Sequence, residues 1–169
     1  MLDSLITSKT RLRLLVKFFV NAANEGHLRG LATEFSESTN AIRKELNNLS
    51  DAGYLEKENV SNKVRYRANE KHPLFLSLQN IVRKYLGLDV IVDQVLERMG
   101  DVKKIILIGD YANGLDTGTI EVVVVGDVLN DDYFNNLSLK IEELINRKVV
   151  FILSTESRDG LVVFENLSK

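Results

Sequence analysis

The chain has 169 residues, of which 44% are hydrophobic, with no cysteine and a formal net charge of −2 at pH 7. This length allows one large domain or two small ones, and the composition allows a proper core. No disulfide framework is possible without cysteine. Because no apolar run reaches the length of a membrane span and the start lacks a signal-peptide pattern, we expect a soluble, cytoplasmic protein with no membrane partner.

Charge is unevenly distributed along the chain. Residues 1–71 hold 12 Lys and Arg against 9 Asp and Glu, a net +3, whereas residues 72–169 hold 10 against 15, a net −5. Net acidity usually argues against nucleic acid as a partner, but here the first part is basic. The asymmetry predicts a basic part that faces DNA, joined to an acidic part that faces something else.

Two amphipathic helices are predicted at the start of the chain. Ser8 can cap a helix running to about Asn21, whose apolar stripe suits a core or a dimer interface. In a second, short helix Leu28, Leu31 and Phe35 recur at helical spacing, so they share a face that needs a partner to bury it.

A third helix is predicted over residues 38–50. A serine can cap its free amides, and Gly53 can end it with a left-handed residue. One face is apolar, and the opposite face carries amide and cationic groups that can read base edges in the major groove of DNA. A solvated helix face is the alternative, since most polar stripes on helices face water. The candidate DNA-binding residues here are Ser38, Thr39, Asn40, Arg43, Lys44 and Asn47.

A basic β-hairpin is predicted over residues 54–68, with a first strand from Tyr54 to Lys57 and a turn that contains Asn59, Ser61 and Asn62. Lys63, Arg65 and Arg67 alternate with Val64 and Tyr66, as in a strand with one buried face. The three cations would point the same way and suit contacts to phosphate or to the minor groove. Lys and Arg also protect exposed sheet edges, so a solubilising role is the alternative.

The order of helix, turn, helix and hairpin resembles the winged helix-turn-helix domains of bacterial regulators of the ArsR and MarR type. The run Leu49-Ser50-Asp51-Ala52-Gly53-Tyr54-Leu55 is similar to the end of their recognition helix. The resemblance implies a transcriptional regulator that places helix 38–50 in the major groove of double-stranded DNA and wing 54–68 on the backbone or minor groove. Metal sensing is not expected, because the chain has no cysteine and only His27 and His72.

Residues 71–100 are expected to form a helical connector. One helix begins at Pro73, the only proline, and a second, Val90 to Met99, follows Gly87. Their apolar stripes could pair with a second copy, because winged-helix proteins commonly read two half-sites as symmetric dimers, or could pack within the chain. We expect a homodimer, and the sequence leaves its interface open.

Beyond Gly100 the pattern predicts a small α/β domain over residues 101–169. With the winged-helix domain at residues 1–70, the chain is expected to be an α+β protein. The predicted elements are strands at Lys103 to Ile108, Ile120 to Val125 and Val149 to Leu153, and a helix at Asp131 to Asn146.

The segment from Gly109 to Gly114, followed by Gly118-Thr119-Ile120-Glu121-Val122, resembles the signature of minimal nucleotidyltransferases. That family has a Gly-Ser turn and then Ser-Asp-x-Asp, whose two carboxylates hold Mg²⁺. Here Thr119 stands at the first carboxylate position and Glu121 at the second. Asp110 stands beside Gly109 in place of the serine, where it would repel a triphosphate by roughly 1 to 4 kcal/mol at about 4 Å.

The second domain is therefore expected to be catalytically inactive, with no metal and no cofactor. It would serve dimerisation or the sensing of a small ligand or protein partner. Two alternatives stay open: an active nucleotidyltransferase that uses Glu121, Asp110 and a borrowed metal site, or an antitoxin-like partner of a toxin.

Overall fold

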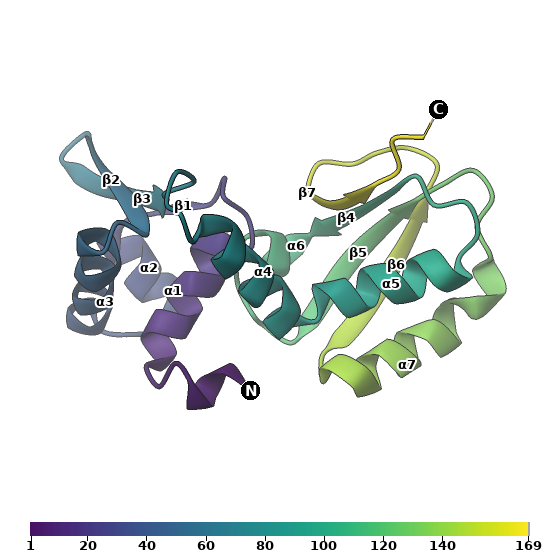
Figure 1. Ribbon diagram of the computed structural model, residues 1–169, viewed down its shortest axis with the longest axis horizontal. Helices are drawn as coiled ribbons and strands as arrows, with labels where there is room; N and C mark the ends of the chain where they lie inside the picture. Colours follow the sequence, from purple (N-terminus) through teal and green to yellow (C-terminus); the bar gives the residue numbers. More distant parts are fainter. Residues whose placement is uncertain (169) are drawn as a thin grey trace. The chain divides into compact units, whose positions relative to one another are not determined.

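Helix α4 (Phe75–Leu86) contains the boundary between two units of the chain. The computed structural model describes residues 1–168, and the units are Met1–Val82 and Arg83–Lys169. The predicted connector is thus divided between the two units. Each unit combines helices with a sheet of its own, and the fold class is α+β, as predicted (Figure 1).

The first unit has helices packed against a small antiparallel sheet with strand order β1-β3-β2. Its core includes Leu14, Phe18, Phe19 and Ile42, none of which is exposed, and the ring of Phe19 lies 5.8 Å from that of Phe75. In chain order the elements before α4 are η1 (Leu2–Ser4), α1 (Lys9–Phe19), β1 (Glu25–Gly26), α2 (Leu28–Phe35), α3 (Thr39–Asp51), β2 (Leu55–Val60) and β3 (Lys63–Ala68).

Both ends of α3 follow the prediction. Ser38 is the N-cap, and its hydroxyl oxygen accepts a hydrogen bond from the amide of Ala41 at 3.2 Å. Gly53 lies just past the other end with φ +81°, a conformation that a Cβ disfavours. The amide of Tyr54 donates to the carbonyl of Leu49 at 2.9 Å, and that of Gly53 to Ser50 at 3.0 Å, which is the Schellman pattern of helix termination.

The wing is a tight hairpin of β2 and β3. Val60 pairs with Lys63, so the connection has only two residues, Ser61 and Asn62, and both have positive φ, as in type I′ turns. Strand β2 is thus longer than predicted. Strand β1 was not predicted; it pairs with the other edge of β3, with Glu25 opposite Arg67.

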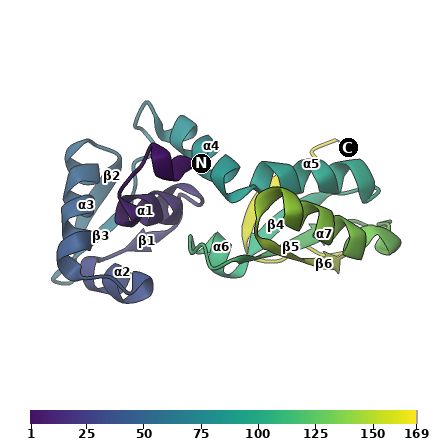
Figure 2. The ribbon, with the colours of Figure 1, turned by 90° about the horizontal axis from the view of Figure 1, so that it is seen from below.

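The second unit has a four-stranded sheet with order β6-β5-β4-β7. Strand β4 is antiparallel to both neighbours, and β5 is parallel to β6. Helices α5 and α7 lie side by side on one face of this sheet (Figures 1 and 2), where the ring of Phe134 lies 5.6 Å from that of Phe151. The elements are α5 (Leu88–Arg98), β4 (Lys104–Ile108), α6 (Gly109–Ala112), β5 (Thr119–Val125), η2 (Asp131–Tyr133), α7 (Phe134–Ile145), β6 (Lys148–Ser154) and β7 (Leu161–Glu165).

Two details of the second unit differ from the prediction. The helix expected from Asp131 begins with a turn of 3-10 helix, η2, before α7. The edge strand β7 was not predicted. Among the described residues, no helix has both the length and the apolar character needed to cross a membrane.

Candidate nucleic-acid interface

Helix α3 has one buried and one exposed face. Ile42, Leu46 and Leu49 are buried in the first unit. The opposite face exposes five of the candidate residues, and within it Arg43 donates a hydrogen bond to the side-chain oxygen of Asn40 at 3.1 Å. Ser38 is exposed as well, but its oxygen is engaged in the cap. The five exposed candidates are Thr39, Asn40, Arg43, Lys44 and Asn47.

The orientation of α3 is fixed by a buried carboxylate that sequence reasoning did not identify. The side chain of Glu45 is only 6% exposed, and it accepts hydrogen bonds from Nε of Arg11 at 2.7 Å and from the hydroxyl of Ser8 at 3.1 Å. Both partners belong to the start of α1. Because hydrogen bonds to charged groups contribute about 1.5 to 3 kcal/mol, this contact ties α3 firmly to α1.

Two of the three cations predicted on the wing are paired with carboxylates. Arg65 donates to Glu58 at 2.7 Å and lies 3.2 Å from Glu25, and Arg67 lies 3.2 Å from Glu56. The hydrogen bond with Glu58 and the charge of Glu25 raise the pKa of Arg65. The outer surface of the wing is therefore close to neutral, and phosphate contact by Arg65 and Arg67 stays a prediction.

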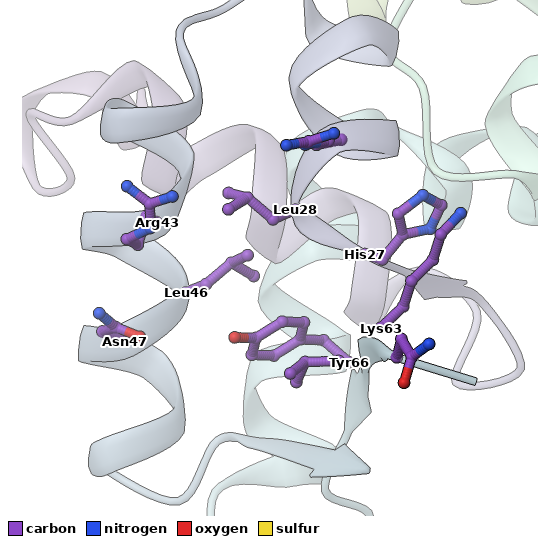
Figure 3. A pocket seen from close by; sticks show the side chains of 10 residues that line it. His27, Leu28, Arg43, Leu46, Asn47, Lys63 and Tyr66 are labelled. Atoms are coloured by element: carbon purple, nitrogen blue, oxygen red, sulfur yellow. The ribbon is translucent and has the colours of Figure 1, made fainter. Parts of the chain in front are cut away.

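A groove of about 640 Å³ lies between α3, the start of α2 and strand β3. We call it the α3–wing groove (Figure 3). Three of its lining residues are aliphatic, Leu28, Leu46 and Val64. Three others, Arg29, Arg43 and Lys63, are exposed cations. No carboxylate pairs with these three cations in the part of the chain that the structure describes.

Tyr66 lines the same groove from β3. The residue is 8% exposed, and Figure 3 shows its phenol oxygen pointing toward α3, where Leu46 and Asn47 lie. Burial raises the pKa of Tyr66, with the charge of Arg43 acting in the opposite direction. Within residues 1–168 the hydroxyl has no hydrogen-bond partner, so it is free to donate to a ligand.

The predicted nucleotidyltransferase positions lie around the turn between β4 and α6. The pairing of Ile108 with Glu121 places the glutamate beside Gly109, and a Cβ at position 109 would overlap its carboxylate oxygen. Gly109 has φ +68°, which also favours glycine. Asp110 accepts a hydrogen bond from the hydroxyl of Thr117 at 2.9 Å, and Thr119 is exposed at the start of β5.

The loop after this turn is held by three side chains whose interaction was not predicted. Arg147 donates from Nε and Nη2 to the carboxylate of Asp116 at 2.9 and 2.7 Å. Tyr111 donates to the same carboxylate and accepts a hydrogen bond from the amide of Gly118 at 2.8 Å. Burial by itself raises the pKa of Asp116, but the hydrogen bonds from Arg147 and Tyr111 outweigh it and hold the pKa below its usual value.

No protein-family model and no curated protein matches the chain. Among solved structures, it is similar to the AntR antimony-specific transcriptional repressor, with TM-score 0.39 and 24% identity over 54% of this chain and 75% of that one. It is also similar to Sso10a-2, a DNA-binding protein from Sulfolobus solfataricus, with TM-score 0.35 and 15% identity over 51% of this chain and 92% of that one.

Human N-acetylserotonin methyltransferase gives TM-score 0.32 and 15% identity over 56% of this chain and 32% of that one. The similar structures thus include a repressor, a DNA-binding protein and an enzyme. The function proposed below therefore rests on the geometry of the chain itself.

Proposed function

We propose that the protein is a DNA-binding transcriptional regulator of the winged helix-turn-helix type. Helix α3 would lie in the major groove of double-stranded DNA, with the β2–β3 hairpin against the flanking backbone or minor groove. The second unit would be a catalytically inactive nucleotidyltransferase-like domain for dimerisation or for sensing a small ligand or protein partner.

The observation that carries the proposal is the exposed face of α3. Arg43, Asn40 and Asn47 present guanidinium and amide groups on a helix that is fixed from behind by Glu45. Such groups can form paired hydrogen bonds with guanine and adenine edges, and a helix of this kind fits the major groove. A rigid anchor favours this use, because base reading requires the side chains to hold one register.

Charge supports the same proposal. The first unit holds 12 Lys and Arg against 9 Asp and Glu, a net +3. Since Glu45, Glu34 and Glu37 are engaged with cations of α1, part of the negative charge lies away from the exposed face of α3. Cations on the face that meets DNA supply the sequence-independent part of binding.

The contacts of the carboxylates near the glycine turn support the proposal that the second unit is inactive. Glu121 packs against Gly109, Asp110 accepts from Thr117, and Asp116 is bound to Arg147. The Glu121 carboxylate lies against Gly109, where its charge would repel a phosphate that approached this turn. No observation among the described residues favours a transferase over the proposed role.

Titration of duplex DNA at two salt concentrations tests the proposal. We expect wild-type binding that weakens steeply with salt, and Arg43→Ala should relax sequence preference in selection from a random duplex pool, because about 1 to 3 kcal/mol of base discrimination is lost. Lys140→Ala, which removes an exposed cation of α7, is the control and should bind like wild type. Absent or salt-independent binding by wild type would refute the proposal.

A further inference from the structure

Most of the lining of the α3–wing groove is not used by the proposed base contacts. It has an aliphatic floor of Leu28, Leu46 and Val64 and a rim of cations without carboxylate partners, Arg29 and Lys63; Arg43, which is assigned to base contacts, lines the α3 side. None of the described residues that line it is acidic. The groove therefore suits an occupant that is anionic on one side and apolar on the other.

The start of α2 adds to the positive potential of the groove. His27 is the N-cap, and its side chain makes no capping hydrogen bond. The first turn of α2 contributes Leu28 and Arg29 to the lining, so the positive end of the helix lies at the groove. Helix N-termini attract anions, and here three side-chain cations lie around one.

Tyr66 provides an independent indication of a ligand. Its hydroxyl is on a side chain that is 8% exposed, points into the groove and has no partner within the described residues. The ring is buried but the hydroxyl opens onto the groove, where an acceptor of another molecule can reach it. Because its pKa is raised by burial, the phenol keeps its proton and can donate to a phosphate oxygen.

We propose that the α3–wing groove binds a phosphodiester segment of a DNA strand, and that its free cations, not the paired arginines of the wing, supply the main backbone contacts. The sugar–phosphate chain alternates charged phosphate with apolar deoxyribose, which matches the cationic rim and the aliphatic floor. The groove also lies between the two elements that would meet the duplex. This inference rests on the proposed function.

The outer surface of the wing has the opposite character. Arg65 and Arg67 can bind phosphate only by leaving Glu58, Glu25 and Glu56, which would then stand near the DNA as free negative charges. Arg29 and Lys63 leave no carboxylate behind when they bind. The difference predicts unequal counterion release for cations that look equivalent in the sequence.

The test compares salt dependence of duplex binding for matched single variants. Lys63→Ala and Arg29→Ala should each reduce the slope of log K against log salt by about one, whereas Arg65→Ala should change it by less than half as much. Tyr66→Phe keeps the ring and should weaken binding roughly tenfold, the loss of one hydrogen bond to a charged group. Thermal unfolding checks that each variant is folded, and Lys63 is exposed, so its variant will fold.

The outcomes separate this inference from the proposed function. If wild type fails to bind DNA, the proposed function fails. If wild type binds, but Arg65→Ala lowers the slope as much as Lys63→Ala or Tyr66→Phe binds like wild type, the groove assignment alone is overturned.

In a second experiment, the Tyr66 ring signal is followed by NMR with inorganic phosphate and with a dinucleoside monophosphate. Stronger binding of the dinucleotide supports a DNA strand, and equal or tighter binding of inorganic phosphate overturns it in favour of a free anion.

Discussion

The exposed face of α3 and the glycine turn of the second unit both carry residues that resemble a family motif, but the structure uses their polar groups differently. On α3 the carboxylate of Glu45 is buried, and the amide and cationic side chains face outward. At the turn, Asp110 accepts a hydrogen bond from Thr117, Asp116 accepts from Arg147, and Glu121 packs against Gly109. A match to a family motif therefore indicates a binding or catalytic role only where the polar groups are also free to contact a ligand.

The largest effect is expected from breaking the Asp116 interaction in the second unit. Arg147→Ala should lower the free energy of unfolding by about 1.5 to 3 kcal/mol, because it removes the two hydrogen bonds that Arg147 donates to the Asp116 carboxylate. Urea denaturation measures this change, and Lys148→Ala, one residue away and exposed, is the matched control. If both variants unfold at the same urea concentration, Asp116 does not hold the loop.

A smaller effect is expected from releasing a wing cation. Glu58→Gln removes the main partner of Arg65 and should tighten duplex binding two- to fivefold, in line with the small energy of an exposed ion pair. It should also steepen the salt dependence. Binding assays at two salt concentrations measure both, and the double variant Glu58→Gln with Arg65→Ala should lose the gain. Unchanged affinity in Glu58→Gln would contradict the idea that Glu58 holds Arg65 away from the DNA.

No effect at all is expected from a nucleoside triphosphate with Mg²⁺ or Mn²⁺. A ligand at 100 times its Kd would stabilise the folded protein by about 2.7 kcal/mol, so binding would show as a clear rise of the unfolding temperature. The same mixtures with labelled nucleotide report any transfer. A thermal shift or a labelled product would contradict the prediction that the second unit is inactive and would support the transferase alternative.

Much of the architecture follows from local signals in the sequence. The serine cap, the apolar stripe and Gly53 define α3 without reference to the rest of the chain. Strand β7 has no such signal: it is a short apolar run whose place at the edge of the sheet depends on pairing with β4. Strand β1 is only two residues long, so no periodicity can reveal it.

The candidate site also has a part that the sequence predicts and a part that it does not. Exposure of Arg43 and Asn47 could be predicted from helical spacing, but the pairing of Arg65 with Glu58 depends on hairpin register. A two-residue turn at Ser61 and Asn62 places these residues opposite each other; with the longer turn that we predicted, the register is different. Glu45 and Arg147 act through partners more than 30 residues away, which no local pattern contains.

The hydroxyl of Ser8 connects the start of α1 to helix α3. It accepts the amide of Arg11 as the cap of α1 and donates to Glu45 of α3, both at 3.1 Å. One small group thus caps one helix and links it to another. If the proposed function holds, a variant at position 8 would change DNA affinity through this linkage, although the residue itself does not contact the DNA.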